Sequence, residues 1–245
     1  MISRPSVLAG LWPAALLMVL LAAGAASAQS LRVMPVNIQM APGQSAITLT
    51  VINEGSAVTA VQVRAYAWNQ SDGTDQLTDT DELLASPPLA SIEAGETQVV
   101  RLVLRRTPKG REATYRILLD QIPAASSPGM VQVVMRMSIP VFAEPATRAV
   151  PHVQFHIERN AGQAYLVVVN DGLRHEAIRD VVLSASDGST LKNDSGTSPY
   201  VLAGATRRWP IDAQAPLPPA GESLHMKAHA DAGALDQQVR IVGVP

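Results

Sequence analysis

Five histidines are the first candidates for metal binding or acid–base catalysis in this sequence: His152, His156, His175, His225 and His229. Two pairs have the spacing H-x3-H, which on a helix would place both imidazoles on one face, within reach of a shared metal ion. Both pairs lie in segments with strand-like alternation, where residues i and i+4 are about 13 Å apart. We therefore expect strand histidines and no metal site.

Acidic residues form a second cluster with the potential to hold a cation, made of Asp72, Asp75, Asp79, Asp81 and Glu82. Their spacing lacks the alternate ligands, the sixth-position Gly and the twelfth-position Glu of a calcium-binding EF-hand loop, so we expect a solvated loop. The sequence also contains no phosphate-binding loop, dinucleotide fingerprint or G-x-S-x-G motif. These observations predict a protein that is not an enzyme and that needs no cofactor.

The composition excludes further classes of function. Of the 245 residues, 47% are hydrophobic and 16% are charged, which is not the composition of a disordered chain. The formal net charge is −2, so there is no positive excess to attract nucleic acid or anionic lipid. Because the chain has no cysteine, disulfides and thiolate chemistry are also excluded.

The first 28 residues have the pattern of an export signal. A basic residue precedes nearly continuous apolar sequence from residue 7 to residue 25, and Ala26, Ser27 and Ala28 have the spacing that a signal peptidase accepts. We predict that residues 1–28 are cleaved and that the mature chain enters the periplasm without stable membrane insertion. A retained membrane anchor is the alternative, because the apolar run is almost long enough to span a bilayer.

Short segments with period-2 alternation predominate after the leader, separated by Gly, Pro and Asn. Such segments are typical of antiparallel β-sandwiches. The one helical turn that we expect lies at residues 79–85, where a capping residue precedes an apolar pair. A proline-bounded segment, residues 144–151, separates two β-rich halves. The sequence therefore predicts an all-β protein with an N-terminal domain at residues 29–145 and a C-terminal domain at residues 146–245.

The segment 131–142, with the sequence VQVVMRMSIPVF, has an unusually regular alternation. One face is an apolar row that continues to Val141 and begins with Val131, Val133, Met135, Met137 and Ile139. The row faces inward in an ordinary core strand, which is the first hypothesis. In the second hypothesis Val134 and Phe142, on the opposite face, contact the core. The row is then open to a partner, since an edge strand left open invites pairing.

Several motifs resemble those of the PapD-like periplasmic chaperones, which act in the chaperone–usher pathway of fimbrial assembly. They are VMPVNIQMAPGQSAITLTVINEG, SPPLASIEAGETQVVRL, REATYRILLDQIP and SIPVFAEP in the first half, and NDGLRHEAIRDVVL and YVLAGATRRWPI in the second. The resemblance covers nearly all of residues 29–245. Departures from the best-known members favour the archaic branch of the family.

The resemblance implies two immunoglobulin-like β-sandwich domains set at an angle, and a G strand that completes the sheet of a bound subunit. The implied partners are pilin or fimbrial subunits and an outer-membrane usher, and self-capping as a homo-oligomer stays open. The implied donor row consists of Val131, Val133, Met135, Met137 and Ile139. A cell-surface adhesive or carbohydrate-binding β-sandwich is the alternative, which the low aromatic content of 4% disfavours.

Two anchors of the best-known family members are absent. Those proteins bind the carboxyl terminus of the subunit with an Arg and a Lys, and alignment places Asn37 and Pro140 at these positions. Arg101 and Arg136 are the substitutes that we expect, because a guanidinium pairs bidentately with a carboxylate. Ordinary solvated arginines are the alternative.

The joint between the domains also departs from the family pattern. Glu144 stands where the family has an Arg before the joint proline, and Glu112 is expected near it. Two carboxylates at this place need a cation from the second domain. We expect Arg207 or Arg208 to supply it.

Overall fold

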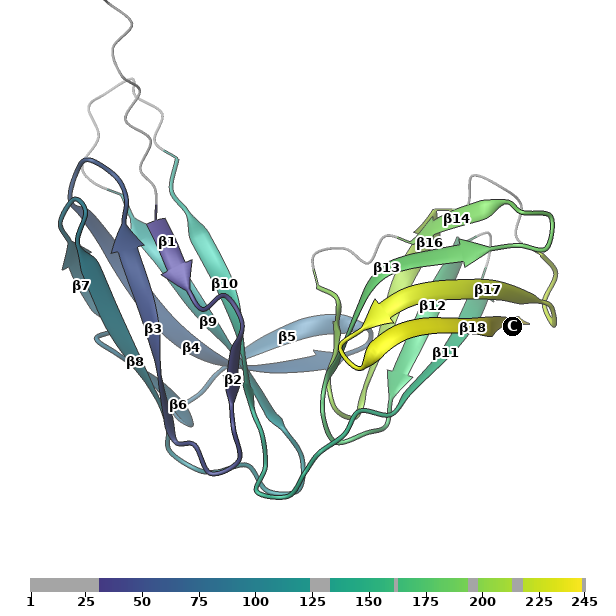
Figure 1. Ribbon diagram of the computed structural model, residues 1–245, viewed down its shortest axis with the longest axis horizontal. Coiled ribbons are helices and arrows are strands. Elements are labelled where there is room, and N and C mark those ends of the chain that lie inside the picture. Colours follow the sequence, from purple (N-terminus) through teal and green to yellow (C-terminus); the bar gives the residue numbers. More distant parts are fainter. Residues whose placement is uncertain (1–30, 124–132, 161–162, 194–197, 213–217, 244–245) are drawn as a thin grey trace, which may run out of the picture.

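The computed structural model describes residues 31–123, 133–160, 163–193, 198–212 and 218–243. All eighteen regular elements in this part of the chain are β-strands, which confirms the predicted all-β fold. No helix among these residues is suited to cross a membrane. Figure 1 shows two β domains that form the arms of a V. The predicted leader lies outside the described residues.

The first domain consists of two sheets that enclose one core. The smaller sheet has the strand order β1-β3-β8-β6, and the larger has the order β2-β10-β9-β4-β5, with β7 paired to β4. The strands are β1 (Leu31–Met34), β2 (Ile38–Met40), β3 (Ala46–Asn53), β4 (Thr59–Ser71), β5 (Thr74–Asp79), β6 (Leu83–Ser86), β7 (Leu89–Ile92), β8 (Thr97–Leu104), β9 (Ala113–Ile122) and β10 (Arg136–Ala143).

Burial alternates along these strands in the way that their sequences predict. Tyr115, Ile117 and Leu119 of β9 are buried, and Val100 and Leu102 of β8 join them in the core from the opposite sheet. The side chains between them point to the outer faces of the two sheets, because successive side chains of a strand alternate.

The end of β5, a bend and the start of β6 occupy residues 79–85 in place of the expected helical turn, so that prediction is wrong. Leu83 is buried in the core and lies opposite Leu104 of β8 in the ladder. This pairing with a distant strand outweighs the local capping signal, because strand formation depends on packing against neighbours.

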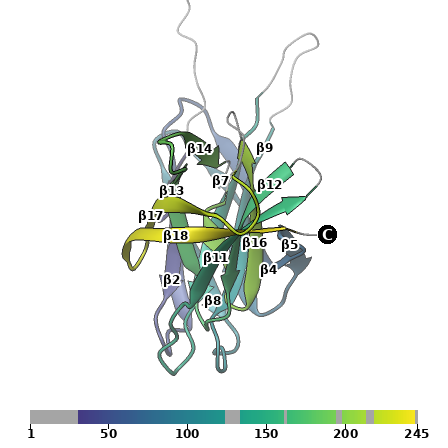
Figure 2. The ribbon, with the colours of Figure 1, turned by 90° about the vertical axis from the view of Figure 1, so that its right-hand side faces the viewer.

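The second domain curls one sheet around its own core. Its strand order is β14-β16-β12-β11-β18-β17-β13-β15, and β14 also pairs with β13. Figure 2 turns this domain toward the viewer. The strands are β11 (Val153–Asn160), β12 (Gln163–Asn170), β13 (Glu176–Ser184), β14 (Thr190–Asn193), β15 (Tyr200–Val201), β16 (Ala205–Asp212), β17 (Ser223–Ala230) and β18 (Gly233–Gly243).

The larger sheet of the first domain makes the contact with the second domain. Trp68 of β4 and Phe142 of β10 lie on the outer face of this sheet and pack against Leu202 and Ala205 of the second domain. The other side chains on the outer face of β10, β9 and β4 therefore look toward the second domain as well.

Candidate functional site

Strand β10 has an edge that is only partly paired. It pairs antiparallel with β9 over its whole length, from Arg136 opposite Asp120 to Ala143 opposite Ala113. On its other side β2 pairs with it in parallel, only at the last three residues of β10. Among the described residues, no strand covers that side of residues 136–140. This stretch is called the free edge below.

The direction of the backbone groups at the free edge follows from one hydrogen bond. The amide of Gln121 donates to the carbonyl of Met135 at 2.9 Å, which makes Met135 a hydrogen-bonded neighbour of β9. Hydrogen-bonded and non-hydrogen-bonded pairs alternate along an antiparallel ladder. The backbone groups of Arg136 and Ser138 therefore point away from β9, into the free edge. Pro140 follows in the same phase, where its missing amide costs no bond to β9.

The apolar row of β10 passes from the core to the surface. Ile139 is only 3% exposed and belongs to the core of the first domain. Met137 and Met135 are half-buried at the margin of that core, whereas Val133 is 84% exposed. Val131 lies outside the described residues. The row is thus inward-facing at one end and accessible at the other.

The expectation that Val134 and Phe142 supply the core contact of this strand is wrong. Val134 is 47% exposed, and Phe142 packs in the junction between the domains rather than in the core of the first domain. The reason is that the outer face of the sheet is itself covered at its lower end by the second domain. An alternation pattern does not reveal which of two apolar faces a neighbouring domain covers.

Arg136 lies on the outer face of β10 in a network of three charges. Its Nε donates to Asp120 of β9, whose second oxygen accepts from Nη2 of Arg64 at 2.6 Å. The hydrogen bond from Arg136 lowers the pKa of Asp120 below its usual value, and Arg64 adds to this effect. One carboxylate thus orients two guanidinium groups, and the network keeps one positive charge toward the second domain.

Arg101, the other expected carboxylate anchor, lies on β8 in the smaller sheet. Its neighbours Val100 and Leu102 are buried in the core, so the Arg101 side chain points outward on the side away from the second domain. The structure therefore does not bring Arg101 and Arg136 together.

Four aromatic rings join the lower end of β10 to the second domain. The ring of Phe142 lies 5.9 Å from that of Trp68 and 5.2 Å from that of Tyr200, measured between centroids. His175 stacks on Phe142 at 3.5 Å. The guanidinium of Arg116 lies 3.7 Å above the Trp68 ring, and burial lowers its pKa from the usual value. Burial of these rings fixes the end of β10 relative to the second domain.

A turn held by Asn170 positions His175. The side-chain amide of Asn170 donates to the carbonyls of Arg174 and Val201, at 2.8 and 3.0 Å. Its oxygen accepts from the amide of Gly172 at 3.0 Å. A Cβ on Gly172 would lie 2.4 Å from the backbone nitrogen of His152, so only glycine fits. The N-D-G turn thus positions Arg174 and His175, two and three residues after its glycine, to face the first domain.

Arg174, not Arg207 or Arg208, is the cation next to the two acidic residues of the joint, which corrects the sequence prediction. Its Nη2 lies 3.3 Å from Glu144 and its Nε lies 3.9 Å from Glu112. The carboxylate of Glu112 is buried, and it also accepts from the backbone amide and Nδ1 of His175, at 2.9 and 2.7 Å. The cation beside these two acids therefore comes from the second domain.

Arg207 does cross the junction, but to a different acid. Its Nη1 lies 3.1 Å from Asp75 of β5. The backbone of Arg207 also forms an isolated β-bridge with Gly73. Gln70 of β4 adds a hydrogen bond from the amide of Leu202, at 2.9 Å. The hairpin β4–β5 therefore docks on the second domain, so that part of the acidic cluster lies in a domain contact instead of a solvated loop.

Arg208 pairs within the second domain. Its Nε donates to Glu158 of β11 at 3.0 Å, and this hydrogen bond lowers the pKa of Glu158. Among the described residues, Arg208 makes no ion pair with the first domain.

No three His, Asp or Glu side chains in the described part of the chain are grouped as metal ligands. Four of the five histidines, outside the junction, lie next to single carboxylates, as His152 does beside Asp171 and His156 beside Glu158. His175 alone is buried. Its role in the junction gave no signal in the spacing of the histidines.

The sequence of the first domain matches a known protein family. Residues 30–149 match the family model described as "Pili and flagellar-assembly chaperone, PapD N-terminal domain". The chain belongs to the PapD-like pilus chaperones. Among curated protein sequences, none matches it.

Solved structures of PapD-like chaperones are similar over both domains, which confirms the predicted pair of immunoglobulin-like β-sandwiches. The CsuC–CsuE chaperone–tip adhesion subunit complex from archaic Csu pili of Acinetobacter baumannii matches at 22% identity and a TM-score of 0.63, over 88% of this chain and 100% of that chain. The Salmonella enterica complex of SafA pilin with the SafB chaperone matches at 16% and 0.61, over 88% and 99%. The E. coli chaperone DraB matches at 20% and 0.58, over 86% and 97%.

Sequence reasoning missed the junction residues of this PapD-like chaperone. Arg174 and His175 stand two and three residues after the glycine of the N-D-G turn, inside a motif that the sequence marks only as a family resemblance. A turn followed within three residues by a basic residue and a histidine, close to a domain boundary, is the signal that the sequence offers. Trp68 and Tyr200 gave no signal, because an aromatic residue in a strand is usually a core residue.

Proposed function

We propose that this PapD-like chaperone holds pilin subunits in the periplasm by donor-strand complementation and passes them to an outer-membrane usher. The observation that carries the proposal is the free edge of β10, which lies beside an apolar row that reaches the surface. A subunit strand that pairs with this edge would receive backbone hydrogen bonds, and the row would enter its open groove. Chaperones of this family act by binding and are not enzymes.

The part of the row that we assign to the subunit runs from Val131 through Val133 and Met135 to Met137. Burial of each such side chain stabilises a complex by roughly 1.5–3 kcal/mol before ordering costs. Ile139, which belongs to the domain's own core, would mark the point where the row passes from subunit to chaperone. The flexible methionine side chains suit a position that contacts both cores.

For the carboxyl terminus of the subunit, Arg136 is the anchor that we propose, supported by Arg64 on the same carboxylate. Arg136 has a side chain that is 64% exposed, and its guanidinium has further donors besides the one that Asp120 uses. Arg101 would have no part in this contact, because it lies on the other sheet. Export by the predicted leader, residues 1–28, would bring the chain to the compartment where subunits arrive.

The test is co-expression with the pilin subunit encoded beside the chaperone. Val133→Asp places a charge in the row at a position so exposed that the fold should not change, and we expect it to abolish co-purification of the subunit. Val58→Asp, at an exposed apolar position in the turn before β4, is the matched control and should retain it. Full co-purification by the Val133 variant would refute the donor row.

The same free edge offers a place for a second copy of the chaperone when no subunit is bound. In that case the Val133 variant should also shift the free protein toward monomer in sedimentation experiments. An unchanged association state would leave subunit binding as the sole use of this edge.

A further inference from the structure

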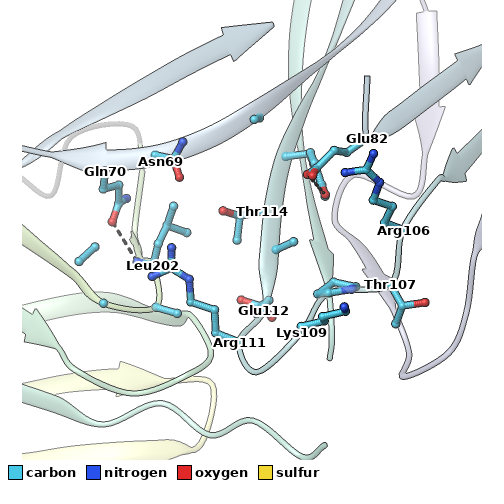
Figure 3. A pocket seen from close by; sticks show the side chains of 17 residues that line it. Asn69, Gln70, Glu82, Arg106, Thr107, Lys109, Arg111, Glu112, Thr114 and Leu202 are labelled. Carbon is cyan, nitrogen blue, oxygen red and sulfur yellow. Dashed lines mark hydrogen bonds between the residues drawn. The ribbon is translucent and has the colours of Figure 1, made fainter. Parts of the chain in front are cut away.

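A cavity of about 720 Å³ lies at the domain junction and is not lined by any residue of β10. Its walls come from both domains, as Figure 3 shows. The first domain contributes the end of β4, most of residues 106–112 and the start of β9. The second contributes residues 202–205, which lead from β15 into β16. A cavity of this size is in the range that holds a small molecule.

Three cationic side chains line this cavity, all from the connection between β8 and β9. They are Arg106, Lys109 and Arg111. None of the three has an ion pair or a side-chain hydrogen bond to any residue that the structure describes. By contrast, Arg105, which precedes them and does not line the cavity, is paired with Asp81 at 2.9 Å.

The acids of the cavity are already engaged elsewhere. Glu82 accepts the hydroxyl of Tyr115 at 3.1 Å. Glu112 accepts two hydrogen bonds from His175 and has Arg174 beside it. The cavity therefore has three cations without a partner among the described residues and two carboxylates that have partners, which leaves a surplus of positive charge along its walls.

Arg111 reaches across the junction to the second domain. A Cβ on Gly204 would lie 3.3 Å from Nη1 of Arg111, and Gly204 has a φ of +72°. The turn at residues 202–205 thus approaches the guanidinium closely because it contains a glycine. The planar donors of Arg111 stand between the two walls, where a bound group can meet both domains at once.

We infer that this cavity binds a small anion that carries two or more phosphate or carboxylate groups. Guanidinium groups pair bidentately with either kind of oxyanion, and a lysine ammonium adds a point charge. An anion with a single charge would satisfy one of the three cations, whereas a multivalent anion satisfies several within one cavity. This binding is separate from the proposed capture of pilin, because the free edge of β10 takes no part in it.

The experiment is calorimetric titration of the mature chaperone with pyrophosphate and with citrate, at constant ionic strength, and with acetate as the monovalent reference. We expect at least one of the two multivalent probes to bind saturably, with one molecule per chaperone. Acetate should show no measurable binding. Pyrophosphate alone would point to phosphate chemistry, and citrate alone to carboxylate chemistry. Absence of binding by both would overturn the inference and leave three ordinary solvated cations.

Matched variants locate the site. Arg111→Gln and Lys109→Gln, both at exposed positions, should each weaken binding by about tenfold, the equivalent of one lost charge-assisted contact. Arg105→Gln, in the same connection but outside the cavity, should leave the affinity unchanged. Equal losses in all three variants would indicate diffuse attraction to a basic surface and overturn the inference. Unfolding temperatures of the variants without ligand verify that each one is folded.

Discussion

Phe142 and His175 stack with their ring centroids 3.5 Å apart and their planes 10° from parallel. Phe142 is the penultimate residue of β10, the strand with the free edge, and His175 belongs to the second domain. Both rings are buried. The stack therefore joins the strand that we assign to subunit binding directly to the second domain. We expect a change in the position of β10 to alter the orientation of the second domain, and the reverse.

Phe142→Ala should loosen this junction. Truncation of a buried phenylalanine costs about 3–5 kcal/mol of unfolding free energy, and here the cavity would lie between the domains. We expect a lower unfolding temperature and, in solution scattering, a wider distribution of domain angles. Phe142→Leu fills part of the space. Its unfolding temperature and its distribution of domain angles should therefore lie between those of Phe142→Ala and the wild type. A scattering profile of Phe142→Ala identical to that of the wild type would show that the other contacts of the junction hold the angle without this ring.

Glu112 is expected to act mainly as a hydrogen-bond acceptor. A carboxylate only accepts, so Nδ1 of His175 carries the proton of their contact. Glu112→Ala would leave two buried donors of His175 unpaired, at about 1–3 kcal/mol each. Glu112→Gln keeps one acceptor oxygen, so it should lose much less unfolding free energy than Glu112→Ala. The measurement is urea unfolding of both variants, and equal losses would contradict an acceptor role.

The ion network on the outer face of β10 should make stability depend on acid pH. The hydrogen bond from Arg136 depresses the pKa of Asp120 in the folded protein. A group with a depressed folded pKa contributes stability above its unfolded value, about 3.9 for aspartate, and this contribution is lost as pH falls through the folded pKa. In Arg136→Gln the pKa of Asp120 should rise toward the ordinary value, as followed by a carboxyl-carbon NMR titration. An unchanged titration would mean that Arg64 alone sets the pKa.

Alternation predicted much of this fold. Strands such as β9 bury every second residue because one face meets the opposite sheet. This alternation can be read from a few consecutive residues of the sequence. The junction is different, since Arg174 meets Glu112 and Arg207 meets Asp75 across long stretches of chain. Nothing in the local sequence states such pairings. The same limit explains the error at Phe142, whose face is buried by another domain.

The unpaired backbone groups of the free edge allow a test that changes no side chain of the apolar row. In the ladder of β10 the amide of Ser138 points away from β9, in the same phase as Pro140. Ser138→Pro should therefore leave the domain folded, since proline is tolerated where the amide is not used by a neighbouring strand.

The same substitution removes an amide that a subunit strand would use at the free edge. Loss of one such bond and the bulk of the ring should weaken subunit capture by about tenfold. Met137→Pro is the counterpart, because the Met137 amide points toward β9, and it should destabilise the domain itself. Capture of the pilin is measured by competition between each variant and the wild type. If Ser138→Pro competes as well as the wild type, pairing at this edge cannot be how the subunit is held.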